Sequence, residues 1–150
     1  SSDHLDAIIS ESFRLVPEKN IRVIIVDSIV GRFRPEYIGR ESLAERQQKL
    51  NRILSRLLKL AEAYNAAIII TNQVIAQPGV FYGDPNKPAG GHVLAHTSTY
   101  RVWLRRGKAG SRVAKIFDSP CHADTEAIFK ITVNGIEDLP DDKKEKEREK

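Results

Sequence analysis

The sequence predicts an α/β fold in which two parallel strands, joined by a crossover helix, are extended by an antiparallel hairpin. Two short apolar runs, residues 23–26 and 66–70, are rich in β-branched side chains, and polar residues follow each of them. The segment between these runs carries an apolar stripe at helical spacing. Residues 100–106 and 111–117 alternate in polarity around the turn Gly107-Lys108-Ala109-Gly110, and glycines at such a turn predict a hairpin.

The N-terminal segment predicts a helix over residues 3–16, which Pro17 should end. Its apolar positions would cover one face of the sheet: Leu5, Ile8, Ile9, Phe13 and Val16. The first strand then delivers Asp27 to its carboxyl end. Four apolar residues followed by aspartate form the pattern of a Walker B strand, whose carboxylate orients Mg²⁺, usually through water, beside nucleotide phosphates. A turn or capping aspartate gives the same pattern, so both interpretations stay open.

Residues 31–40 form a basic, aromatic segment in which Arg32, Arg34 and Arg40 are interspersed with Phe33 and Tyr37. The planar fork of arginine matches phosphate oxygens, so the segment would suit contact with a phosphate backbone. The alternative, which this segment alone slightly favours, is a solvated loop with ordinary surface arginines.

The tetrapeptide Ser42-Leu43-Ala44-Glu45 is a capping box and predicts a helix that begins near Leu43. Its predicted buried stripe consists of Leu50, Ile53, Leu54, Leu57, Leu58, Ala61 and Tyr64. The basic residues towards the other side are expected to face solvent: Lys49, Arg52, Arg56 and Lys59.

The second strand, residues 66–70, is an unbroken apolar run, which suits a parallel strand that is buried on both faces. The triplet Thr71-Asn72-Gln73 follows where this strand should emerge, and ligands bind at the carboxyl ends of strands in open α/β sheets. Residues 74–91 are then too many for a simple connector, and they end in Gly90-Gly91. We therefore predict a ligand-sensing strand end that leads directly into a binding loop.

Beyond the loop, residues 92–99 are expected to form a short helix, and residues 127–133 a final strand before the turn Asn134-Gly135. The hairpin between them carries basic residues and no acid before Asp118: Arg101, Arg105, Arg106, Lys108, Arg112 and Lys115. Whether they face DNA, a subunit interface or solvent stays open. The last ten residues hold five acids and five bases. We expect residues 1–138 to be folded and residues 139–150 to be a charged, disordered tail.

Length and composition, 150 residues of which 41% are apolar, indicate one soluble domain. No apolar run approaches the roughly 20 residues of a membrane span, and no secretory signal begins the chain. A single cysteine, Cys121, fits a reducing compartment, so a cytoplasmic location is expected. Neither a GxxxxGK(S/T) phosphate loop nor HExxH or CxxC metal spacing is present. The chain begins with Ser1 and lacks methionine, so we interpret it as processed or as an excerpt.

Five strings of the sequence closely resemble, in their order, the ATPase core of the archaeal RadA recombinases of the RecA family. They are VIIVDS, FRPEYIGRESLAERQQKL, IIITNQV, DPNKPAGGHVLAH and RVWLRRGKAGSRVAKIFDSP. The resemblance covers residues 1–138. It implies the C-terminal portion of a RecA-like P-loop NTPase core, ATP and Mg²⁺ as cofactors, and a role in DNA repair and homologous recombination.

The resemblance also implies roles for individual residues. Asp27 would be the Walker B carboxylate that holds Mg²⁺ through water, and Gln73 would link the γ-phosphate to a DNA-binding loop over residues 74–89. His96 and the segment Asp118-Ser119-Pro120 would contact ATP bound by a neighbouring subunit. The residues implied in DNA binding are Arg34, Arg40, Val74, Gln77, Phe81, Tyr82, Lys87, Gly90 and Gly91.

The implied partners are single- and double-stranded DNA and further copies of the protein in rings or filaments, in a nucleoid-associated protein without membrane contact. In the family the phosphate loop precedes the matching region, so we expect these 150 residues alone to be inactive. The alternative is a non-catalytic recombinase paralogue or split-gene product that binds and regulates recombinase subunits. A RecA-core helicase is disfavoured, because GGHVLAH and GRESLAERQQ are not expected in one.

Overall fold

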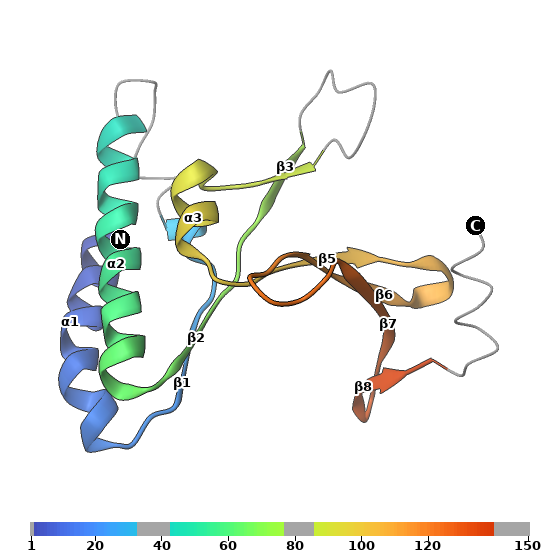
Figure 1. The fold of residues 1–150 in the computed structure, drawn as a ribbon, viewed down its shortest axis with the longest axis horizontal. Helices are drawn as coiled ribbons and strands as arrows, with labels where there is room; N and C mark the ends of the chain where they lie inside the picture. The colour runs from blue at the N-terminus through green and yellow to red at the C-terminus, as the bar shows by residue number, and fades with distance from the viewer. Residues whose placement is uncertain (1, 33–42, 77–85, 140–150) are drawn as a thin grey trace. The chain divides into compact units, whose positions relative to one another are not determined.

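The computed structural model describes residues 2–32, 43–76 and 86–139, drawn in colour in Figure 1. Their contacts divide the chain into two compact units, Ser1–Thr97 and Ser98–Lys150. The strands of the first unit form two two-stranded sheets, and those of the second form one four-stranded sheet. The sequence predicted that the antiparallel hairpin would extend the parallel pair, and this prediction was wrong. Among the described strands, β1 and β2 pair only with each other.

The first unit contains the predicted strand–helix–strand arrangement. Its elements are α1 (Ser2–Glu18), β1 (Val23–Val26), the 3-10 turn η1 (Val30–Arg32), α2 (Leu43–Tyr64), β2 (Ala67–Ile70), β3 (Val74–Ala76), β4 (Asn86–Pro88) and α3 (Gly91–Thr97). Strands β1 and β2 pair in parallel from Val23 opposite Ala67 to Val26 opposite Ile70. The crossover through α2 is thus confirmed, as is the short helix after the loop. Ser42, the predicted cap, lies outside the described residues.

Helix α1 continues two residues further than predicted, to Glu18. Pro17 lies inside it, and a proline cannot donate the backbone hydrogen bond that residue 13 would otherwise accept. The Tyr64 hydroxyl donates to the Phe13 carbonyl instead, at 3.0 Å. The partner for the orphaned carbonyl therefore comes from α2, and the helix passes through the proline.

Helix α2 supplies more buried residues to the core of the first unit than any other described element. Its buried residues are Leu50, Ile53, Leu54, Leu57 and Leu60. The predicted stripe was wrong at Leu58, which is 40% exposed, while Leu60 is completely buried. These two residues flank the stripe on opposite edges, and the neighbouring elements cover only the edge of Leu60.

The β1–β2 pair is covered on one face only among the described residues. Val26, Ile68 and Ile70 pack against the core cluster, whereas Ile25 and Ile69 are 64% and 51% exposed. Figure 1 shows α1 and α2 on the same side of the two strands. The prediction that the second strand is buried on both faces is therefore wrong here. Alternate side chains of a strand point to opposite faces, and only one face has helices against it.

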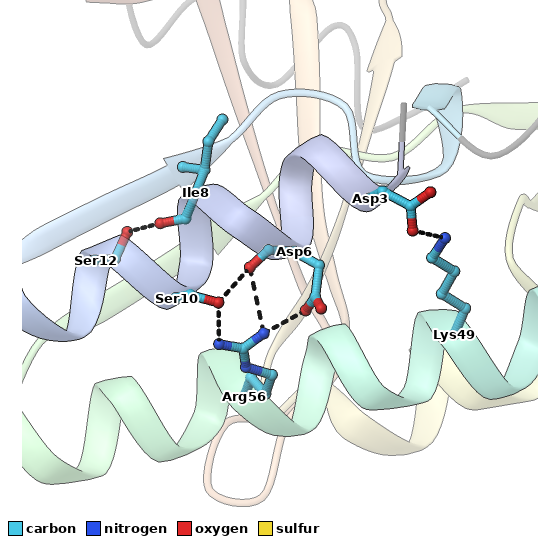
Figure 2. A network of polar contacts seen from close by, with 7 residues as sticks. All are labelled: Asp3, Asp6, Ile8, Ser10, Ser12, Lys49 and Arg56. Atoms are coloured by element: carbon cyan, nitrogen blue, oxygen red, sulfur yellow. Dashed lines mark hydrogen bonds and ion pairs between the residues drawn. The ribbon is translucent and has the colours of Figure 1, made fainter.

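Polar contacts hold α1 against α2 (Figure 2). Arg56 donates to the Asp6 carboxylate at 2.5 Å and to the Ser10 hydroxyl at 2.7 Å. Lys49 pairs with Asp3, and this hydrogen bond, with the ammonium charge, lowers the pKa of Asp3. The expectation that Lys49 and Arg56 face solvent was wrong, because α1 presents acids to them. Arg52 and Lys59 are exposed, as expected.

The second unit is an antiparallel sheet with strand order β5-β6-β7-β8. Its elements are β5 (Arg101–Arg106), the 3-10 turn η2 (Lys108–Gly110), β6 (Arg112–Asp118), β7 (Thr125–Thr132) and β8 (Gly135–Asp138). The predicted hairpin and the turn at Asn134-Gly135 are confirmed, but a fourth strand, β8, follows that turn. Leu139 is buried. Residues 140–150 lie outside the described part, so their disorder stays a prediction.

We expect Gly107→Ala to destabilise the hairpin turn. A Cβ at Gly107 would lie 2.2 Å from the Ser111 hydroxyl oxygen, which is held in place by donating to the Lys108 carbonyl at 2.8 Å. Overpacking of this kind costs about 1–3 kcal/mol of unfolding free energy, measurable by chemical denaturation. Lys108→Ala, at an exposed side chain of the same turn, is the control, and an equal loss in both variants would contradict the steric explanation.

Candidate nucleotide and DNA site

The carboxyl ends of β1 and β2 lie side by side and bring Asp27 next to Thr71. The Thr71 amide donates to the Val26 carbonyl at 3.1 Å, and its hydroxyl donates to a carboxylate oxygen of Asp27. The Asp27 side chain is otherwise exposed. The strand pairing thus places an oriented carboxylate where the sequence predicted a Walker B aspartate. The sequence did not single out its partner Thr71, although the polar triplet after the strand contained the signal.

Ser28 follows Asp27 and has a side chain with unused hydrogen-bonding capacity. Its hydroxyl is buried, and among the described residues it has no hydrogen-bond partner. Asp27 and Ser28 line a groove of about 520 Å³ between α1 and β1, together with His4, Ile8 and Ile25. A carboxylate and a free hydroxyl at the end of a strand are oxygen ligands of the kind that Mg²⁺ and its bound water prefer.

The residues that follow β2 fasten the long loop at its base. The Asn72 side-chain amide donates to the Ala89 carbonyl at 2.6 Å, and its oxygen accepts from the Gln73 amide at 2.9 Å. The Ala89 amide donates to the Gln73 carbonyl at 2.8 Å. The side chain of Gln73 is exposed. Asn72 was predicted only as a member of the polar triplet at the strand end, without a role of its own.

The base of the loop is a hairpin that the sequence did not predict. Strands β3 and β4 pair antiparallel, with Val74 opposite Pro88 and Ala76 opposite Asn86. Val74 and Lys87 are exposed on this stem, whereas Gly90 and Gly91 adopt positive φ where α3 begins. The other residues predicted to bind DNA lie outside the described part of the chain: Arg34, Arg40, Gln77, Phe81 and Tyr82.

His96 lies on α3, immediately beyond this hairpin. It is exposed, and its ring stacks on that of His92 with centroids 6.0 Å apart and planes inclined by 23°. The His96 side chain is therefore accessible to solvent.

The segment Asp118-Ser119-Pro120 belongs to the second unit, at the end of β6. Asp118 accepts from the Arg101 guanidinium at 2.7 Å, and the Ser119 hydroxyl accepts from the amides of Cys121 and His122. Pro120 is exposed. The segment is thus a turn with its own internal hydrogen bonds. Beside it, a 3.5 Å contact between the Tyr100 hydroxyl and the Cys121 sulfur raises the pKa of Tyr100.

Acids from neighbouring strands and turns neutralise part of the basic hairpin. Arg105 pairs with Glu126 at 3.2 Å and Lys115 with Asp124 at 3.8 Å, in addition to Arg101 with Asp118. The pair between Arg105 and Glu126 could not be predicted from the hairpin sequence alone, because Glu126 lies on β7. Arg106 and Lys108 are exposed, and neither forms an ion pair with another of the described residues.

No three metal-binding side chains gather anywhere in the residues that the structure describes. In the same residues, no helix combines the length and the apolar character that crossing a membrane requires. The candidate site thus consists of the polar residues after β1 and β2, the hydrogen-bonded base of the β3–β4 hairpin and the exposed His96.

These features occur in a member of the Rad51 family. The chain belongs to this family, whose model matches residues 1–139. It is 54% identical over 141 residues to the DNA repair and recombination protein RadA of Ignicoccus hospitalis, covering 94% of this chain and 43% of that protein. It is 46% identical over 149 residues to the RadA of Cenarchaeum symbiosum, covering 99% of this chain and 37% of that protein. The chain thus spans less than half the length of these relatives.

Proposed function

We propose that this chain is part of an ATP-dependent DNA strand-exchange recombinase that acts in DNA repair and homologous recombination. The observation that carries the proposal is the 54% identity to a protein named for DNA repair and recombination, over 94% of the chain. In the proposed protein, further copies assemble into rings or filaments. The fold would be the C-terminal portion of a RecA-like P-loop core.

The proposed nucleotide site uses Asp27 and Gln73 in one subunit, and His96 with the segment Asp118-Ser119-Pro120 from a neighbour. Bound Mg²⁺ neutralises the charge that develops on the transferred phosphoryl group. Asp27 would hold this ion through water, and its hydrogen bond from Thr71 supports that role by fixing the carboxylate. Gln73 is exposed and neutral, so it can accept and donate hydrogen bonds to a phosphate without adding charge.

The proposed DNA-binding surface comprises Arg34, Arg40 and the loop over residues 74–89, with Gly90 and Gly91 at its end. The exposed ammonium of Lys87 on the hairpin stem supports contact with phosphates. Such contacts bind single- and double-stranded DNA largely without base preference. Strand exchange needs this tolerance, because base pairing itself tests homology.

Salt dependence tests the DNA-binding surface. Removing one phosphate contact should make the plot of log affinity for single-stranded DNA against log salt concentration less steep by about 0.7. We expect this for Arg40→Ala, measured by fluorescence anisotropy with a labelled oligothymidine. Arg14→Ala removes the same charge on α1, where Arg14 pairs with Glu11 and Glu18, and should leave the slope unchanged. Identical slopes for Arg40→Ala and the unmodified protein would refute the placement of Arg40.

A further inference from the structure

The Asn72 side chain joins the two ends of the β3–β4 hairpin. Asn72 precedes β3, and Ala89 follows β4, seventeen positions along the chain. Three hydrogen bonds close the base: Asn72 to the Ala89 carbonyl, the Gln73 amide to Asn72, and the Ala89 amide to the Gln73 carbonyl. Both ends of the hairpin are therefore connected through one amide side chain.

The far side of this connection is anchored in the core. Ala89 is only 1% exposed and belongs to the core cluster. At Gly90, a Cβ would lie 3.1 Å from the Val30 side chain. The Ala89 carbonyl is thus a fixed acceptor, and a side chain that binds it gains a fixed position itself.

Asparagine has the chemistry that this position requires. Its amide group both donates and accepts, and here it does both. Aspartate has nearly the same shape, but its ionised form only accepts. An aspartate at position 72 would still accept from the Gln73 amide, but its second oxygen could not donate to the Ala89 carbonyl and would repel it.

The connection also continues towards the strand end. Thr71, the residue before Asn72, holds Asp27 through its hydroxyl and β1 through its amide. Three consecutive residues therefore have distinct contacts. Thr71 holds the candidate metal-orienting carboxylate, while the Asn72 side chain and the Gln73 carbonyl both bind Ala89 at the base of the hairpin.

We propose that Asn72 is a positioning residue that clasps the base of the β3–β4 hairpin and thereby sets the direction in which Gln73 and the hairpin leave the sheet. The consequence for DNA rests on the proposed function of the loop. Opening the clasp frees the hairpin from the core and adds an ordering cost to DNA binding.

The test compares Asn72→Asp with Asn51→Asp, which introduces the same charge at an exposed position of α2. In the 150-residue chain, hydrogen–deuterium exchange reports the protection of the Ala89 amide, and anisotropy reports affinity for an oligothymidine. Loss of one hydrogen bond should lower protection roughly tenfold in Asn72→Asp and weaken DNA binding. Asn51→Asp should change neither.

Acidification provides a rescue that a general loss of stability would not show. A protonated aspartic acid regains an O–H donor, so the protection factor in Asn72→Asp should recover as the pH falls towards about 4. Asn72→Ala has no donor at any pH and should not recover relative to the unmodified chain. It also serves as the test variant if Asn72→Asp does not fold.

Four outcomes separate the clasp from the proposed function. Unchanged Ala89 protection in both Asn72 variants would overturn the clasp, whatever happens to DNA. Lost protection with unchanged DNA affinity would overturn the positioning role. If the unmodified chain did not bind the oligothymidine and the Asn72 variants still lost protection, the result would support the clasp and count against the loop as a DNA-binding element. Lost protection together with weakened DNA binding supports both.

Discussion

Replacing Leu54 by alanine is expected to lower the unfolding free energy of the first unit by about 3 kcal/mol. Leu54 is 2% exposed and belongs to the cluster that joins α2 to α1, η1 and α3. Truncation removes apolar contacts and leaves a cavity that the surrounding helices can fill only in part. Chemical denaturation followed by circular dichroism measures the change.

Leu58→Ala is the matched control, with the same chemical change one turn further along the same helix. Leu58 is 40% exposed, so its truncation should cost well under half as much. The sequence pattern placed both leucines in the buried stripe, and only the structure separates them. Equal losses in the two variants would show that Leu58 is buried in solution.

Asp27→Asn is expected to lower ATP hydrolysis at least about 100-fold in a longer recombinase polypeptide that contains this sequence and a phosphate loop. Losing the carboxylate weakens the hold on Mg²⁺, whose charge stabilisation is worth several kcal/mol. Thr71→Val keeps the carboxylate but removes the hydroxyl that orients it. Partners of this kind typically contribute 10- to 100-fold, so we expect a loss in that range and a higher Mg²⁺ requirement. Phosphate release, titrated with Mg²⁺, measures both.

Asp138→Asn is the control for charge, because Asp138 is exposed at the end of β8 in the second unit. It should retain full hydrolysis. If Thr71→Val had normal activity at every Mg²⁺ concentration, the hydrogen bond to Asp27 would have no part in positioning the ion. If Asp27→Asn were fully active, the assignment of the Walker B residue would fail.

Hydrophobic periodicity was sufficient to predict the main elements. The apolar runs at β1 and β2, the helical stripe between them and the glycine-containing turn after β5 each predicted the element that the structure contains. Such patterns are local, because the alternation of a strand and the 3.6-residue repeat of a helix depend only on nearby residues. Asp27 and Gln73 became candidates for a related reason, since Asp27 follows the apolar run of β1 directly and Gln73 ends the polar triplet after β2.

The tertiary structure decided which neighbours these elements meet. An apolar stripe defines a helix face but not which edge of that face is covered. Leu58 was therefore predicted to be buried but is exposed, whereas Leu60 was not predicted but is buried. Lys49 and Arg56 proved to be partners of α1, because only packing brings Asp3 and Asp6 beside them.

The sequence alone thus determined the family, the order of the main helices and strands, and the strand end that carries Asp27, but not β3, β4 or β8. The structure alone revealed that Thr71 holds this carboxylate and that Asn72 clasps the hairpin. Both contacts join residues at least seventeen positions apart. A one-dimensional pattern cannot encode them, because hydrogen bonds between distant residues depend on how the strands pair and where the chain returns to the core.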